Sequence, residues 1–419
     1  MDTNSSPSPK AELLVRPSLN DHKVVEDLLA PTAGIGSRPI SRLVLNAADA
    51  PRQAAFSEVA AKSGTPLIVD PLTTLLQCEV DPEDPWVQEV NFGRAEALDP
   101  TLLANPFTLD KLVAEIVEFQ VDNGATVVVP PYFYADKPES LEFEASLAAI
   151  GRTARRLRAD GVALPIMPVL SAQLRGFLHR PDWQAALDRF TLAAADVGPQ
   201  TIAVQFSPMG DGSESYGKIL DLILGARHIR SAGVPTIAWR QGVYGPALVA
   251  AGLDGYECGM GIGEQAKAKA FMGSRKPRKK SGKGFSPEGV YLAVLGRSVP
   301  RRVAGVLLED RSLQGRLVCD SLRCCPQGAH SMMASKGRPH AVRGRSRGLQ
   351  ELVEIPSIDW RLHHIGKEAA SGFVAATKAN EVLAKANFPN RIKPNSYAAL
   401  EQVTDYLRKQ GVRDARDSA

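Results

Sequence analysis

Two aspartates stand where apolar runs of the sequence end, and their carboxylates are the groups best suited to chemistry. Asp70 follows the run at residues 67–69, and Asp320 follows the run at residues 317–319. If both runs are strands of one closed barrel, both carboxylates point into its mouth. Such a pair suits chemistry at a sugar C1′ carbon, where one carboxylate attacks and the other moves protons. Alternatively, each aspartate caps the helix that follows it.

Glycines recur at every second position near residues 255–264, where a buried strand would normally carry bulky side chains. Glycine weakens a strand, so Gly259, Gly261 and Gly263 need a physical reason. A flat ligand could lie against the bare backbone and use its amide and carbonyl groups. Glu264 then stands at the end of this strand. The alternative is a tight strand-to-helix turn that holds no ligand.

Two glutamines lie at or just beyond predicted strand ends. Gln205 and Gln241 can each offer a donor and an acceptor to the edge of a heterocycle. The alternative is that each side chain satisfies the backbone of its own loop, and the sequence does not separate these two roles.

A group of cysteines and histidines in the last third of the chain has the residue types of a metal site. Cys319, Cys324, Cys325, His330 and His340 lie within a short stretch. There is no C-x-x-C pair among them, and adjacent cysteines do not easily bind one tetrahedral zinc ion. We therefore expect no metal or other cofactor, with zinc at these residues as the alternative. The odd number of cysteines, five, indicates reduced thiols.

The elements that must position these residues follow the pattern of a parallel sheet covered by helices. Short apolar runs alternate with longer amphipathic ones, and polar residues recur where the runs end, as in a barrel whose active site is built from strand ends. We predict an α/β fold of the (β/α)8 TIM-barrel type, with an open doubly wound sheet as the alternative. Nine runs are one too many, so the first is taken as peripheral. The runs span residues 43–46, 67–70, 126–130, 166–170, 202–206, 236–239, 256–262, 290–295 and 316–319. The residues at their ends are Asp70, Tyr132, Ser171, Gln205, Gln241, Glu264 and Asp320.

The chain has 419 residues, of which 44% are hydrophobic and 23% charged, so it can form a large globular domain with appendages. We predict a disordered tail at residues 1–20, the barrel at residues 21–348 and a C-terminal helical region at residues 349–419. The long connection at residues 78–113 indicates a surface insertion or, alternatively, a lid. No stretch looks like a membrane span or a signal peptide, so we expect a cytoplasmic location.

The net charge is only +4, but the basic residues are clustered. One cluster follows Glu264, and a second follows the last predicted strand. Two clusters beside one rim favour contacts with the phosphates of a nucleic acid, and solvated charged loops are the alternative. The residues predicted to make these contacts are Arg275, Lys276, Arg278, Lys279, Lys280, Lys283, Arg343, Arg345 and Arg347.

Residues 253–264, which read Leu-Asp-Gly-Tyr-Glu-Cys-Gly-Met-Gly-Ile-Gly-Glu, resemble the glycine-rich base-binding strand of tRNA-guanine transglycosylases. Three further segments keep the order of that family: the strand ending in Asp70, the glutamine-glycine turn at residues 241–244, and the strand ending in Asp320. The resemblance spans roughly residues 66–383. It departs from the family at residues 130–134, where a base-recognising aspartate is expected, and Ala379 stands at the family's zinc histidine.

The resemblance implies a pentosyltransferase that exchanges a base in tRNA or DNA, in tRNA processing or DNA modification. Asp320 would attack C1′ of a flipped-out nucleotide, while Asp70 moves protons. Guanine would be replaced by a 7-deazaguanine-type base, as in queuosine. Whether the chain forms a homodimer stays open. The residues that would hold the base are Tyr132, Gln205, Gln241, Gly259, Met260, Gly261 and Glu264.

Two other functions stay open. The chain could be a non-catalytic barrel that binds nucleic acid, such as a silent partner subunit of a transglycosylase, and Tyr132 near the position of the expected aspartate favours this. It could also be an unrelated β/α-barrel enzyme with a small phosphorylated substrate. In that case the basic loop beyond Glu264 is incidental.

Overall fold

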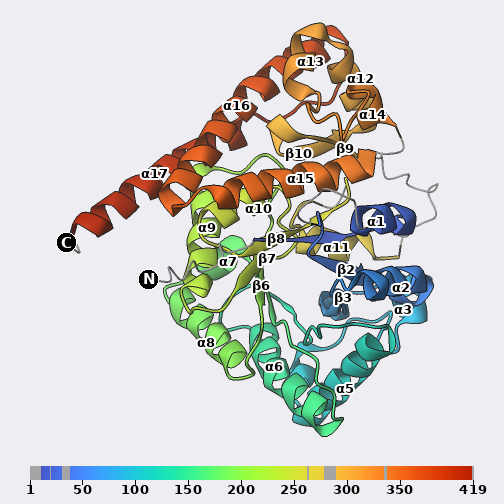
Figure 1. Cartoon of the computed structure of the whole chain (residues 1–419). Helices are drawn as coiled ribbons and strands as arrows, with labels where there is room; N and C mark the ends of the chain where they lie inside the picture. Colours follow the sequence, from blue (N-terminus) through green and yellow to red (C-terminus); the bar gives the residue numbers. More distant parts are fainter. Residues whose placement is uncertain are drawn as a thin grey trace, which may run out of the picture.

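A computed structural model of the chain describes residues 11–18, 20–30, 38–261, 264–277, 289–334 and 337–417. Its centre is a parallel sheet with helices around it (Figure 1). Within the described ranges the sheet has eight strands, in the order β3-β2-β1-β8-β7-β6-β5-β4. These strands are β1 (Glu12–Arg16), β2 (Arg42–Asn46), β3 (Leu67–Asp70), β4 (Tyr134–Ala135), β5 (Val169–Gln173), β6 (Ile202–Ser207), β7 (Thr236–Ala238) and β8 (Gly255–Gly259).

The segment just before β4 closes this sheet into a barrel. Val127 forms a parallel bridge with Ile68 of β3, and Val128 forms one with Ile166, shortly before β5. The amide of Val128 donates to the carbonyl of Pro165 at 2.9 Å. Both ends of the strand order are therefore joined, and the predicted (β/α)8 TIM-type barrel is confirmed.

Helices cover the outside of the barrel, one after each strand. Several begin at residues with the expected capping chemistry: Asn105 caps α5 and Ser140 caps α6 through side-chain oxygens that accept backbone N–H groups. The covering helices are α1 (His22–Leu29), α2 (Ala54–Ser63), α5 (Pro106–Asp122), α6 (Leu141–Ala159), α8 (Trp183–Ala195), α9 (Tyr216–Arg230), α10 (Gly245–Ala250) and α15 (Gly337–Glu354). Short helices in the connections are η1 (Ala50–Arg52), η2 (Thr73–Gln77), α3 (Pro85–Glu89), α4 (Pro100–Leu103), α7 (Leu174–Leu178), α11 (Ala268–Ser274) and η3 (Ala293–Leu295).

The N-terminal region corrects the predicted disordered tail at residues 1–20, because Glu12–Arg16 form β1 in the middle of the sheet. The strand pairs with β2 on one side and β8 on the other. Leu14 and Val15 are fully buried. The run at residues 43–46, taken as peripheral, is β2 of the barrel. With β1 counted, the barrel no longer needs the last two predicted strands.

Those last two runs are not barrel strands. The first is part of an antiparallel hairpin, β9 (Gly289–Leu292) and β10 (Arg297–Pro300). The second lies in and just after helix α13 (Arg311–Leu317), in which Leu313 and Leu317 are buried one turn apart. A short apolar run such as residues 317–319 suits a strand or one side of a helix equally, and packing decides between them.

The hairpin belongs to an insertion between β8 and the helix that completes the barrel. Residues 289–334 also contain α12 (Arg301–Glu309), α13 and α14 (Ala329–Met333), and they share a second hydrophobic core with the helix α16 (Ile358–Lys385). After the insertion, α15 packs against α1, α10 and β1. Figure 1 shows α15 lying between the barrel and the insertion. The predicted boundary at residues 348/349 falls inside α15. The helices α16 and α17 (Asn395–Asp417) then pack against each other.

The long connection at residues 78–113 packs into the barrel wall. Trp86 of α3 is fully buried, and its indole N–H donates to the carbonyl of Pro71 at 3.2 Å. This anchoring favours the insertion over the lid. None of the helices within the described ranges combines the length and the apolar character that a bilayer crossing requires.

Candidate functional site

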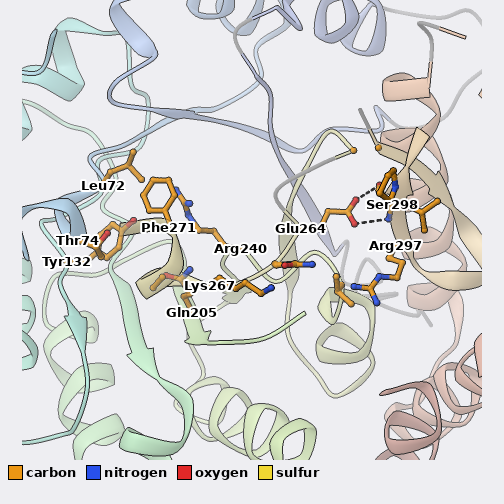
Figure 2. A pocket seen from close by; sticks show the side chains of 17 residues that line it. Leu72, Thr74, Tyr132, Gln205, Arg240, Glu264, Lys267, Phe271, Arg297 and Ser298 are labelled. Atoms are coloured by element: carbon orange, nitrogen blue, oxygen red, sulfur yellow. Dashed lines mark hydrogen bonds between the residues drawn. The ribbon is translucent and has the colours of Figure 1, made fainter. Parts of the chain in front are cut away.

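A cavity of about 410 Å³ opens at the carboxyl ends of the barrel strands, between the barrel and the hairpin. Figure 2 shows Arg240 and Phe271 beside each other on one side and Glu264, Ser298 and Arg297 on the other. The cavity is lined by Leu72, Thr74, Tyr132, Gln205, Arg240, Val243, Gly261, Glu264, Gln265, Lys267, Ala268, Phe271, Gly289, Arg297, Ser298, Val299 and Pro300. This is the end of the barrel at which such folds build their active sites.

Asp70 lies fully buried beneath one side of this cavity. Its carboxylate oxygen Oδ2 is 2.9 Å from the Arg16 guanidinium and 3.0 Å from that of Arg240. The Tyr132 hydroxyl donates to Oδ1 at 2.7 Å, and the Leu72 amide donates to the same oxygen at 3.1 Å. Burial alone raises the pKa of Asp70, but the charges of Arg16 and Arg240 outweigh it and hold this pKa below its usual value. Asp70 is therefore an ionised carboxylate at neutral pH.

The hydroxyl of Tyr132 is the opposite case. Burial, followed by the neighbouring negative charge of Asp70, raises the pKa of Tyr132 well above its usual value. The phenol therefore stays protonated and donates to Asp70. Neither Asp70 nor Tyr132 is poised to exchange a proton near neutral pH, so the acid/base role predicted for Asp70 has no support in this geometry.

A second buried carboxylate balances the charge of this network. Glu257 of β8 accepts from Arg16 Nε at 2.6 Å and from the backbone amide of Arg240 at 3.1 Å. Two guanidiniums thus face two carboxylates. Arg240 has a left-handed backbone with φ of 54°, which is rare for a residue that carries a side chain. Such strain gathers at functional sites, and here it places the guanidinium 5.1 Å from the centre of the Phe271 ring.

The opposite wall is held by a second buried ion pair. Glu264 pairs with Arg345, and both side chains are almost completely buried. The Glu264 carboxylate also accepts from the Ser298 amide at 2.9 Å and from the Ser298 hydroxyl at 2.7 Å. The guanidinium of Arg345 donates to the Gly242 carbonyl at 2.8 Å and lies 4.4 Å from the centre of the Tyr291 ring.

Two further cations line the cavity, and neither has a carboxylate partner among the residues that the structure describes. Arg297 donates to the Gly210 carbonyl at 2.9 Å, which leaves its charge in place. Lys267 is half-buried and makes no ion pair within the described parts of the chain. The charges of Asp70 and Glu257 balance those of Arg16 and Arg240, and the charge of Glu264 balances that of Arg345. The remaining charges, on Lys267 and Arg297, therefore make this cavity positively charged.

Asp320 does not take part in the cavity. Its side chain is 85% exposed, follows α13 in the insertion, and pairs with Arg347 at 3.0 Å. The prediction that Asp70 and Asp320 meet in one barrel mouth is wrong, because the segment just before Asp320 is helix α13 and not a barrel strand. The proposed attack on a sugar C1′ carbon loses its nucleophile.

Of the predicted glycines that the structure describes, Gly261 lines the cavity, but the hairpin packs against its carbonyl. A side-chain carbon added to Gly289 of the hairpin would lie 1.9 Å from the carbonyl oxygen of Gly261. Hairpin and strand thus approach each other closely, and this contact is the physical reason for Gly261 and Gly289. Gly259 ends β8 beside Arg16, Met260 is buried, and Gly263 lies outside the described residues.

The remaining predicted base-binding residues divide between the cavity and the protein backbone. Gln205 lines the cavity, and its side-chain oxygen accepts from the Ser171 hydroxyl at 2.8 Å. Gln241 is buried and donates to the Phe206 carbonyl at 2.7 Å, so it satisfies protein backbone instead of facing a ligand. Tyr132 and Glu264 line the cavity but are committed to Asp70 and Arg345.

The predicted phosphate contacts are scattered. Arg275 pairs with Asp84 at 3.0 Å, while Lys276 is exposed. Arg343 and Arg347 are partly exposed on α15, but Arg345 is buried against Glu264. Arg278, Lys279, Lys280 and Lys283 lie outside the described residues. A nucleic-acid partner stays a prediction.

A group of cysteine and histidine side chains away from the cavity could hold a metal ion. The ligand atoms of Cys319, Cys324, Cys325 and His340 all lie within 4.8 Å of one another, while His330 is not part of the group. His340 Nδ1 is 3.3 Å from the sulfurs of Cys324 and Cys325, and these two sulfurs are 3.8 Å apart. Although adjacent cysteines were expected not to bind one zinc ion easily, the sulfurs of Cys324 and Cys325 thus lie close enough to share an ion.

Sequence reasoning missed much of the network. Arg16 and Arg240 were not singled out, nor were Lys267, Arg297 and Glu257. Arg16 carried a usable signal, because it follows the apolar run at residues 13–15 just as Asp70 follows its own run. Arg240 directly follows the predicted run at residues 236–239, which is the same signal. Arg297 had none, since its hairpin reaches the cavity only through tertiary packing.

The structure defines this chain as a β/α barrel with a cavity at its mouth, and comparison with known proteins adds nothing closer. No family model and no curated protein matches the sequence. Similar solved structures include 2,3-dimethylmalate lyase, described as a PEP mutase/isocitrate lyase superfamily member, at 12% identity and a TM-score of 0.34, covering 64% of this chain and 81% of that one. Deoxyribose phosphate aldolase from Aeropyrum pernix matches at 15% identity and a TM-score of 0.29, covering 63% and 89%. (S)-3-O-geranylgeranylglyceryl phosphate synthase from Thermoplasma acidophilum matches at 11% identity and a TM-score of 0.31, covering 64% of this chain and 94% of that one. Likeness this remote assigns no function to the chain.

The geometry of the site corrects the resemblance to tRNA-guanine transglycosylases. The nucleophile that the resemblance required lies outside the cavity, and the hairpin packs against the backbone of Gly261, where the base was expected to lie. Base exchange in tRNA or DNA, with the queuosine-type chemistry that it implied, is therefore wrong for this chain, as is the silent transglycosylase subunit.

Proposed function

We propose that the protein is an enzyme that acts on a small organic substrate bearing an oxyanion, such as a phosphate or a carboxylate. The observation that carries this proposal is the charge of the cavity. Lys267 and Arg297 face it without carboxylate partners in the described structure, while the other charged groups around it are paired. Two cations in a partly closed cavity favour a dianion.

The rest of the cavity suits the organic part of such a substrate. Leu72, Phe271 and Val299 supply an apolar surface, and the Gln205 amide can still donate to a ligand. Lys267 is the one amine among the lining residues, so we assign to it either binding of the oxyanion or amine chemistry on a bound carbonyl. The position at the strand ends and the strained backbone of Arg240 favour an enzyme over a simple binding protein.

A binding titration tests the oxyanion site. Inorganic phosphate and malonate are titrated separately by calorimetry into the parent and into the variants Lys267→Met and Arg297→Gln. We expect saturable binding of at least one probe, weakened about tenfold or more in either variant. Which probe binds distinguishes a phosphate site from a carboxylate site. Turnover of small phosphorylated metabolites, followed by ³¹P NMR, should be lost in Lys267→Met.

Two surface substitutions serve as matched controls. Lys62 and Arg227 are exposed on outer helices and make no ion pair in the part of the chain that the structure describes. Lys62→Met and Arg227→Gln should bind as the parent does. Absence of saturable binding in the parent, or equal weakening by the control variants, contradicts the oxyanion site.

We also propose that the metal at the Cys/His group is Zn²⁺. A tetrahedral zinc with bonds of about 2.3 Å to sulfur needs sulfurs about 3.8 Å apart, which matches Cys324 and Cys325. His340 Nε2 lies 3.0 Å from the Tyr291 carbonyl, so the ring proton belongs on Nε2 and the Nδ1 lone pair is free for the metal. Three thiolates and one imidazole fill the tetrahedron. The ion would therefore tie the insertion to α15 instead of binding substrate.

Metal analysis of the purified protein tests the zinc site. We expect about one equivalent of zinc per chain, which Cys325→Ser and His340→Ala should lose. Cys78→Ser is the control, because Cys78 is a free cysteine outside the group. A purified protein without zinc that also fails to take up Zn²⁺ or Co²⁺ would contradict the site.

A further inference from the structure

The carboxylates on the two sides of the cavity differ in whether they line it. Asp70 and Glu257 are buried beneath the cavity, but Glu264 is one of its lining residues. Glu264 also stands three residues before Lys267 in the sequence, and it is hydrogen-bonded to Ser298, the neighbour of Arg297. A carboxylate in that position could neutralise the cations that a substrate oxyanion needs.

Arg345 is placed to prevent this. Its guanidinium pairs with Glu264 from the side of α15 and does not line the cavity. The Gly242 carbonyl accepts from it at 2.8 Å, and the Tyr291 ring lies 4.4 Å away, so its position is fixed from three sides. Glu264 is thereby held against the wall by Arg345 and Ser298.

We infer that Arg345 is a positioning residue that keeps Glu264 from neutralising Lys267 and Arg297, and so sets the preference of the cavity for anions. The inference rests on the proposed oxyanion site and adds its electrostatic control. It assigns no contact between Arg345 and the substrate. If Arg345 is removed, the free carboxylate of Glu264 competes with the substrate for the same cations.

A double-variant experiment separates this role from simple packing. Phosphate and malonate binding is measured by calorimetry for the parent, Arg345→Met, Glu264→Gln and the combined variant, with circular dichroism as the folding control. We expect Arg345→Met to weaken binding about tenfold or more. Glu264→Gln alone should bind as tightly as the parent or more tightly. The combined variant should recover to within about threefold of the parent, because replacing both charges removes the competing carboxylate.

A conservative variant keeps the experiment decisive if Arg345→Met folds poorly. Arg345→Lys retains the charge and should keep most of the binding. A folded combined variant that binds as weakly as Arg345→Met, or an Arg345→Met variant that binds like the parent, overturns the inference while leaving the oxyanion site intact. If the parent binds neither probe, the proposed function fails and the inference fails with it.

Discussion

The state of a single carboxylate is decided by what surrounds it. Asp70 sits where its sequence position predicts, at the end of a strand in the barrel mouth. Its pairing with Arg16 and Arg240 could not be predicted, because these two residues lie far from Asp70 in the sequence. Those two guanidiniums turn a candidate proton donor into a fixed anion that holds Arg240 beside the cavity.

The pH dependence of stability follows from this environment. The pKa of Asp70 is lower in the folded protein than in the unfolded chain, where it is about 3.9. Its contribution is therefore present above pH 3.9 and is lost as the pH falls through the lower folded value. Asp70→Asn should reduce the free energy of unfolding by about 3–5 kcal/mol at pH 7, since it removes the buried negative charge shared by Arg16 and Arg240 and leaves only Glu257 to pair with Arg16. Urea unfolding should show this difference shrinking as the pH falls below about 3.9.

Asp320→Asn is the matched control for that experiment. The Asp320 side chain is largely exposed, so its replacement should change the free energy of unfolding by no more than about 0.5 kcal/mol at any pH. A difference between parent and Asp70→Asn that stays constant from pH 7 to about pH 3 would contradict the assigned ionisation.

Among the elements, β1 has the largest consequences for the fold. Its five residues were hidden beside a Ser/Pro-rich start, although Leu13-Leu14-Val15 is an apolar run of the right length. The strand pairs with β2 and β8, and without it the barrel has an unpaired gap. The composition of residues 1–20 misled the prediction, because it combines a Ser/Pro-rich segment with the residues that form β1.

Leu14 tests the importance of this strand. Its side chain is fully buried inside the barrel, so Leu14→Ala should lower the free energy of unfolding by about 2–5 kcal/mol through lost burial and a residual void. Chemical unfolding followed by circular dichroism measures this. Leu192 on α8 is 64% exposed, and Leu192→Ala should cost little. Equal losses in the two variants would mean that β1 is not part of the stable core.

The element-level predictions that failed share one cause. Seven of the runs predicted as strands lie in or beside barrel strands, because alternation of short apolar and longer amphipathic segments is written locally. The runs at residues 290–295 and 316–319 carry the same local pattern in an insertion with its own core. Likewise, glycines spaced by two residues mark a close approach, but the sequence does not say whether ligand or protein approaches.

At the scale of the whole molecule, the insertion explains why the site could be predicted only in part. The ends of the predicted strands identified Asp70 beneath the cavity and Tyr132 and Gln205 in its lining. Arg297 and Ser298, in contrast, reach the cavity from the hairpin. Arg345 arrives on α15, after the insertion. Half of the site thus depends on how a second unit sits on the barrel, which no local pattern records.

The strand order also constrains how a ribosome can make this protein. Leu13 of β1 pairs beside Tyr256 of β8, about 240 residues later in the chain. At typical synthesis speeds of about 5–20 residues per second, the first strand waits roughly 12 to 50 seconds for that neighbour. During that interval the edge of β1 that pairs with β8 stays open to other nascent chains, even after β2 has paired with the opposite edge. A chaperone that binds the nascent chain at the ribosome should therefore raise the yield of this protein.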